Sequence, residues 1–216
     1  MNFALKLFHQ DKKVNQTLFL YMVYCLTLLL VRAKITQSVY LFFLIWNLFL
    51  AFVPYIISSY FQSLDTKNNP KFKLYTLLTI WLLFIPNSFY IITDLVHLDN
   101  SDGFIFWLDL IIISSYALIG FGLGLLSLSH FEKTLQTIIS KKYATIILFC
   151  ISSLCGFGIY VGRILRYNSW DIISNPFDLI VDLFIAATSK TSLLFSVQFG
   201  IFIYFAFLIK KNITSK

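Results

Sequence analysis

Charged residues are scarce in this sequence. They make up 12% of its 216 residues, whereas soluble domains average about 25%. A soluble domain of this length needs a polar surface, and there are too few polar side chains here to cover one. Hydrophobic residues instead make up 58% of the chain and aromatic residues 19%, and the mean hydropathy is +0.79. These values exclude an ordinary soluble domain and indicate an integral membrane protein.

Cysteine is also rare, and the common catalytic motifs are missing. Cys25, Cys150 and Cys155 all lie in apolar runs, their number is odd, and none belongs to a Cys-x-x-Cys pair. We therefore expect buried packing thiols rather than a disulfide framework or a zinc site. No HExxH or GxSxG pattern occurs. We predict no cofactor and no metal, and the sequence leaves open whether the protein is an enzyme.

The formal net charge of +7 does not indicate a nucleic-acid partner. The basic residues stand at the ends of apolar runs, as membrane topology requires, and they form no compact basic face. The partner that the composition predicts is the lipid bilayer.

Six apolar runs are long enough to cross a membrane, which takes about 20 residues as a helix. The first run is short, and the sequence around Arg32 weakly resembles a signal-peptidase site. An arginine inside such a site is unusual, so we expect this run to be retained as an anchor. The fold class is therefore an all-α polytopic bundle in one membrane domain, residues 1–216, with spans at about 14–31, 39–60, 74–92, 104–128, 144–162 and 192–209.

The distribution of charge predicts an orientation. With both termini cytoplasmic, twelve of the 17 Lys and Arg residues fall inside, and seven of the ten acids fall outside. This agrees with the positive-inside tendency. The three arginines, Arg32, Arg163 and Arg166, are all outside. We expect a multi-pass protein of the bacterial cytoplasmic membrane.

The long outer connection 163–191 contains one more helical segment. Asn175 followed by Pro176 is typical of a helix start, and residues 177–188 form an otherwise apolar run with Asp178 and Asp182 on one face. About twelve residues cannot cross a bilayer. We therefore predict a short interfacial or re-entrant helix on the outer side.

The third span carries polar residues that packing does not require. Pro86 should kink it, and if the helix continues, Asn87, Tyr90, Asp94 and His97 form one stripe with spacings of three, four and three. A polar stripe on a span normally faces the bundle interior or a wet cavity. The alternative is a kinked helix with ordinary polar contacts between helices.

Two further spans bring charge to the same outer level. Asp109 shares a helical face with Gly120 and Gly124, where another helix can approach closely. The fifth span has the close-packing pair Gly158 and Gly162, and then Arg163 and Arg166 at a helical spacing of three. Outer arginines need a local partner. We predict one outer polar site: Asp94, His97, Asp109, Arg163, Arg166 and Asp171, supported by Asn47, Pro86, Asn87, Tyr90, Asn168 and Trp170.

Four sequence blocks resemble a known family. They are residues 46–51 (WNLFLA), 84–87 (FIPN), 90–95 (YIITDL) and 162–171 (GRILRYNSWD). Together they resemble the bacterial domain of unknown function 1361 family of multi-pass membrane proteins. The resemblance covers roughly residue 41 to the sixth span. It implies a multi-pass bacterial membrane protein and assigns no catalytic residue.

The sequence leaves three functions open. The outer site could bind an anionic or lipid-headgroup ligand, with Arg163 and Arg166 holding a phosphate or carboxylate, and Asp94 and His97 could act there as base and orienting group. Alternatively, the charges are structural, and the protein is a non-catalytic scaffold or partner of another membrane protein in an envelope or signalling assembly. A small transporter is the third reading, although no inverted repeat of broken helices is evident.

Overall fold

The computed structural model describes residues 12–64, 70–100, 103–167 and 171–214, and every regular element in these ranges is a helix. Six helices are long and apolar enough to cross a membrane, α4 being counted together with η2. This confirms the all-α bundle. The elements are α2 (Lys12–Thr36), η1 (Tyr40–Phe42), α3 (Phe43–Ser63), α4 (Lys71–Tyr90), η2 (Ile91–Asn100), α5 (Gly103–Leu135), α6 (Lys141–Arg163), α7 (Asp171–Ser174), α8 (Pro176–Thr188) and α9 (Lys190–Thr214).

The helices extend beyond the apolar runs that predicted them. The largest difference is in α5, which was predicted to end near residue 128 and ends at Leu135. The added turns carry Ser129 and Glu132, which bond to Lys210 and Lys211 of α9. Hydropathy marks only the segment that lies in hydrocarbon, whereas the backbone remains helical into the polar region.

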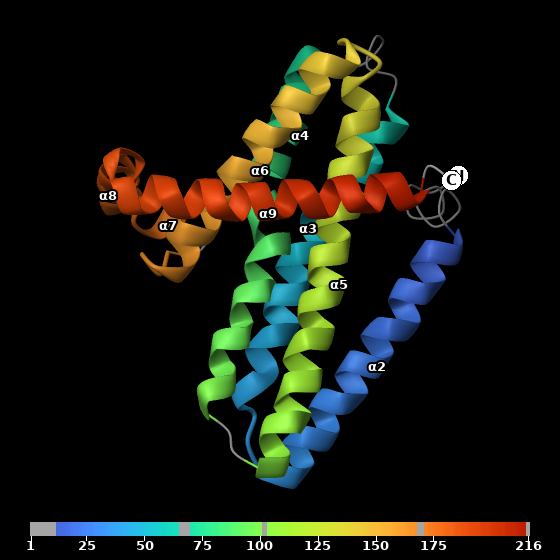
Figure 1. Cartoon of the computed structure of the whole chain (residues 1–216), viewed down its shortest axis with the longest axis vertical. Coiled ribbons are helices and arrows are strands. Elements are labelled where there is room, and N and C mark those ends of the chain that lie inside the picture. The colour runs from blue at the N-terminus through green and yellow to red at the C-terminus, as the bar shows by residue number, and fades with distance from the viewer. Residues whose placement is uncertain (1–11, 65–69, 101–102, 168–170, 215–216) are drawn as a thin grey trace.

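The helices fan out rather than run parallel. In Figure 1, α3, α4 and α5 follow the long axis, α2 and α6 are inclined to it, and α9 crosses the others. Toward the top of Figure 1 lie the end of α3, the start of α4 and the connection α5–α6, and toward the bottom lie the end of α2, the start of α3 and the start of α5. Along the long axis, α3, α4 and α5 therefore run in alternating directions.

Glycines set the closest helix contacts, as predicted. A Cβ added at Gly124 of α5 would meet the Phe89 ring at 2.7 Å, and one at Gly158 of α6 would meet Pro86 at 2.6 Å. A larger residue at either position would force the α4 side chains against it to move. A third contact of this kind, not predicted, joins α6 to α9, where a Cβ at Gly156 would lie 2.3 Å from the backbone oxygen of Ser196.

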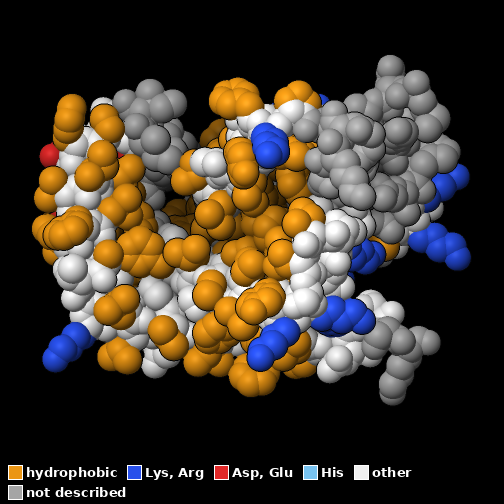
Figure 2. All heavy atoms as spheres, turned by 90° about the horizontal axis from the view of Figure 1, so that it is seen from above, with side chains coloured by type: hydrophobic (Ala, Val, Ile, Leu, Met, Phe, Trp, Pro, Cys, Tyr) orange, Lys and Arg blue, Asp and Glu red, His pale blue; other side chains and the backbone are white. Residues whose placement is uncertain are grey.

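The outward faces are apolar. Leu118 is 67% exposed and Leu20 is 69% exposed in the isolated chain, and Figure 2 shows hydrophobic side chains over much of one face, with separate Lys and Arg side chains among them. Such faces suit lipid. One prediction fails here. Cys25 and Cys155 are buried, but Cys150 is exposed, because its side of α6 faces outward, where a thiol is as well placed as any small apolar group.

The predicted short helix is present as α8. It begins at Pro176, directly after Asn175 at the N-cap position. The Asn175 side chain does not cap the backbone but donates to the Asp178 carboxylate at 2.9 Å. Phe177 and Phe184 are 82% and 73% exposed. At 13 residues, α8 is too short to cross a bilayer, and its interfacial placement remains a prediction.

Candidate functional site

Asp94 is the centre of a polar cluster that η2 forms with its neighbours, and it is only 1% exposed. One carboxylate oxygen, Oδ2, accepts from the Asn47 side chain of α3 at 2.8 Å. The other, Oδ1, accepts from Nη2 of Arg163 at 2.5 Å. Three segments that are far apart in the chain, α3, η2 and the end of α6, are thus joined at one buried carboxylate.

Arg163 is held from several sides but is not enclosed. Its Nε donates to the Thr93 hydroxyl at 2.8 Å, and its guanidinium lies over the Tyr90 ring, 4.5 Å from the centroid. Its side chain keeps 20% exposure, against 1% for Asp94. Among the described residues, nothing bonds to Nη1. One edge of the planar fork is therefore fixed by the protein, and the described residues leave the Nη1 edge without a partner.

The polar stripe of the third span exists, but not as one α-helix. The chain changes from α-helix to 3-10 helix after Tyr90. In a 3-10 helix, side chains three apart share a face, so Asp94 and His97 stay aligned. Asn87 and Tyr90, one turn earlier, line a cavity. The prediction that one α-helix carries all four residues of the stripe was therefore wrong beyond Tyr90.

His97 meets the start of the second span. Its Nδ1 lies 2.9 Å from the Tyr40 hydroxyl, and its ring packs edge-on against Phe43 with 4.9 Å between centroids. Among the described residues, no three His, Cys, Asp or Glu side chains are grouped so that they could hold a metal. The histidine thus packs edge-on against aromatic side chains and lies on the same face of the 3-10 helix as Asp94.

Asp109 does not belong to the Arg163 cluster, contrary to the prediction. Both of its oxygens accept from Arg32 of α2, at 2.9 Å from Nε and 3.1 Å from Nη2. The sequence suggested a partner near the end of the fifth span because both lie at the outer level. However, α2 packs against α5 and supplies its own arginine. The residues predicted at the outer level therefore form two separate ion pairs.

Arg166 is also outside the cluster, and Asp171 belongs to α7. Helix α6 ends at Arg163, and Arg166 lies in the following turn with φ +64°. Its exposed side chain makes no ion pair or hydrogen bond with the described residues. The helical spacing predicted for Arg163 and Arg166 is therefore wrong. Asp171 begins α7 and accepts from Ser174 at 3.0 Å. The predicted supporting residues Asn168 and Trp170 lie outside the described residues.

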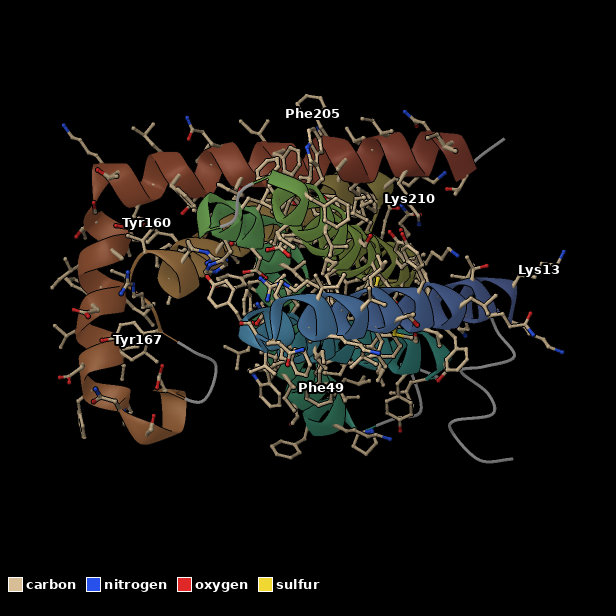
Figure 3. The ribbon with its side chains drawn as sticks, turned by 90° about the horizontal axis from the view of Figure 1, so that it is seen from below. Lys13, Phe49, Tyr160, Tyr167, Phe205 and Lys210 are labelled. Carbon is tan, nitrogen blue, oxygen red and sulfur yellow. The ribbon has the colours of Figure 1, made fainter. Side chains whose placement is uncertain are left out.

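A cavity of about 350 Å³ lies beside the Asp94–Arg163 pair, between α3, α4, α6 and α8. This is within the size range of small-molecule sites. Four polar side chains line it: Asn47, Asn87, Tyr90 and Tyr167. Figure 3 shows Tyr167 in the space between α8 and the bundle, where its hydroxyl donates to Asp182 at 2.8 Å. The other walls are apolar: Trp46, Leu50, Leu82, Leu83, Pro86, Leu154, Phe157, Gly158, Val161, Gly162, Leu179 and Leu183.

Sequence reasoning missed a second buried polar network near the far ends of α3 and α5. The Trp81 indole donates to the Ser127 hydroxyl at 2.8 Å, and the Ser59 hydroxyl lies 3.1 Å from His130 Nδ1. Its signal in the sequence is the spacing of three between Ser127 and His130, which puts both on one face of a helix. Serine is common in helix interfaces, so this spacing alone does not predict a polar network.

These features define a polytopic helical membrane protein with two buried ion pairs at one side and a cavity next to one of them. The chain belongs to the family described as "Protein of unknown function (DUF1361)", whose match covers residues 46–206. The match includes Asn47, Asp94, Asp109 and Arg163, and it begins after Arg32. No curated protein and no solved structure matches the chain significantly.

Proposed function

We propose that the protein binds an anionic headgroup at Arg163, on the outer side of the bacterial cytoplasmic membrane, with both of its own termini in the cytoplasm. The observation that carries this proposal is that the Arg163 guanidinium is held in place but only partly hydrogen-bonded. Nε and Nη2 are fixed by Thr93 and Asp94, whereas Nη1 is unused by the described residues and the side chain is partly exposed. A fixed, planar and incompletely bonded arginine suits a phosphate or carboxylate.

The Asp94 carboxylate limits what this site can do. It neutralises Arg163, so an added anion gains less than it would from a free cation. In return, Asp94 and Thr93 hold the fork in place, so a ligand does not have to order a long side chain on binding. The site therefore favours selective, moderate binding of one anionic group.

The competing interpretation is a structural clamp between α3, η2 and α6. Buried ion pairs add little stability compared with apolar residues of similar volume, so stability alone gives a weak reason for this arrangement. Exchanging the two charges separates the interpretations. The Asp94→Arg, Arg163→Asp double variant should recover much of a simple salt bridge, but it should not recover a ligand site.

Lipid binding to the purified protein tests the proposal. In native mass spectrometry, the wild-type chain should retain phosphatidylglycerol in preference to phosphatidylcholine. Arg163→Gln should lose this preference, and Arg163→Lys should keep only part of it because the ammonium lacks the fork. Lys190→Gln is the matched control, since Lys190 is an exposed cation predicted on the same side. An unchanged preference in a folded Arg163→Gln variant would contradict the proposal.

A second candidate function, as a partner of another membrane protein, is favoured by one observation. Five large apolar side chains of α8 are exposed on the isolated chain. If they bind a partner, purification in mild detergent should recover a stoichiometric companion, and replacing Phe177 and Phe184 by Ser should release it. Isolation of the chain alone would count against this function. The five residues are Phe177, Ile180, Val181, Phe184 and Ile185.

A further inference from the structure

We infer that the cavity between α3, α4, α6 and α8 holds the hydrocarbon chain of the ligand, so that the ligand is an amphiphile with an anionic head rather than a free anion. This inference rests on the proposed function, because the head is the group that Arg163 binds. It adds the chemical class of the ligand and the direction from which it enters.

Polarity within the cavity changes from one end to the other. On α4, Leu82 and Leu83 come first, and Asn87 and Tyr90 follow toward the outer end. On α6, Leu154 and Phe157 likewise precede the glycine beside Arg163. From Leu82 to Tyr90 a helix rises about 12 Å at 1.5 Å per residue. The cavity is therefore apolar at its inner end and polar at its outer end.

The polar end adjoins the arginine. Asn47 lines the cavity and bonds to Asp94, and Tyr90 lines it and lies beneath the Arg163 guanidinium. The Tyr90 hydroxyl has no bond to any described residue. A headgroup at this end would meet Arg163 and the Tyr90 hydroxyl together, and the rest of the molecule would extend toward the leucines.

The cavity opens sideways. In the isolated chain, Trp46, Leu83 and Leu154 of its wall are 48%, 51% and 50% exposed. They lie on spanning helices, so in a bilayer they face lipid. A molecule entering from the bilayer brings its chain past these side chains without crossing a polar barrier. Since one water occupies about 30 Å³, a volume of about 350 Å³ accommodates roughly ten groups of that size, which is enough for much of an acyl chain.

A comparison of ligands in detergent tests this inference. Dodecyl phosphate should raise the unfolding temperature of the wild-type protein by a shift that grows with its concentration, whereas inorganic phosphate at the same concentration should not. Leu154→Trp and Leu83→Trp, on two different walls, should each abolish the shift by filling the cavity. Leu118→Trp is the control, because Leu118 is 67% exposed on α5 and lies away from the cavity.

The outcomes separate the two proposals. If inorganic phosphate stabilises the protein as well as dodecyl phosphate does, and Arg163→Gln abolishes both shifts, the headgroup site stands and the chain site is refuted. If dodecanol stabilises wild type and Arg163→Gln equally, the cavity binds chains but the headgroup proposal fails. If Leu118→Trp abolishes the shift as fully as the cavity variants do, the assignment to this cavity is wrong.

A photo-crosslinking experiment in phosphatidylcholine nanodiscs identifies the source of the amphiphile. Phosphatidylglycerol with a diazirine near the end of its acyl chain should label Leu83, Leu154 or Phe157 more strongly than exposed faces such as Leu20 of α2. Equal labelling of all lipid-facing surfaces would overturn the assignment of a phospholipid chain to the cavity.

Discussion

Arg32 and Asp109 lie 77 positions apart in the sequence and form a two-bond ion pair in which both side chains are nearly buried, at 8% and 3% exposure. The pair joins the end of α2 to the first turns of α5. The third nitrogen of the fork, Nη1, lies 3.4 Å from the Ser38 carbonyl. The guanidinium is thus bonded on every edge, unlike that of Arg163, which marks Arg32 as a structural residue.

Removing one partner of this pair should destabilise the protein strongly. Arg32→Leu leaves the Asp109 carboxylate buried without a partner, which typically costs about 3–5 kcal/mol. The double variant with Asp109→Leu as well should lose much less, since it leaves no buried charge. Unfolding by denaturing detergent, followed by circular dichroism, measures both. A double variant that is no more stable than the single one would contradict this assignment.

Close contact between α6 and α9 gives a second prediction. A Cβ at Gly156 would lie 2.3 Å from a backbone oxygen of α9. Because backbone cannot rotate away as a side chain can, Gly156→Ala should cost about 1–3 kcal/mol as overpacking. Gly122→Ala is the control: nothing lies within 4 Å of its Cβ, so it should be neutral or stabilising. Thermal unfolding of the two variants side by side is the measurement, and similar losses in both would refute the packing argument.

The sequence predicted the spans well because these depend on composition along a single helix. It also predicted that Gly120, Gly124, Gly158 and Gly162 mark close helix packing, since a small residue repeated every four positions has few other uses. It brought Asp94 and Arg163 together because each needs an opposite charge at the same membrane depth.

The remaining contacts depended on which helices are neighbours, which depth alone does not determine. Asp109 and Arg32 are predicted at the outer level like Asp94 and Arg163, and two acids and two bases can be paired in two ways. Only the packing of α2 on α5 selects one of them. The exposed turn at Arg166 and the 3-10 segment after Tyr90 are local backbone changes that helical periodicity does not reveal.

The buried hydrogen bond between Trp81 and Ser127 gives a third prediction. Ser127→Ala removes the acceptor of the indole N–H at 2.8 Å and leaves that donor buried, which should cost about 1–3 kcal/mol. Ser152→Ala is the matched control. Ser152 is equally buried, but its hydroxyl only adds a bond to the Leu148 carbonyl of its own helix, so its loss should be small. Equal unfolding midpoints for the two variants would disprove the role given to Ser127.

The bond from Tyr167 to Asp182 predicts a dependence on alkaline pH. The Asp182 carboxylate accepts a hydrogen bond from the phenolic O–H and repels the phenolate, which raises the pKa of Tyr167 from its ordinary value of 10.0 to about 12. Because the pKa is higher in the folded protein, the stabilisation should be complete below pH 10. It should decrease as the pH rises toward the folded pKa, since the unfolded chain then loses this proton more readily.

Two measurements check this pH dependence. The difference in phenolate absorbance between wild type and Tyr167→Phe isolates one tyrosine, and it should show ionisation near pH 12. Asp182→Asn should move that ionisation back toward the ordinary pKa, because the amide carries no charge. The stability advantage of wild type over Tyr167→Phe should be constant through neutral pH and shrink above pH 10. If the tyrosine ionises at its ordinary pKa in the folded wild type, the bond between α8 and the segment after α6 is absent in solution, and the cavity loses the wall that Tyr167 provides.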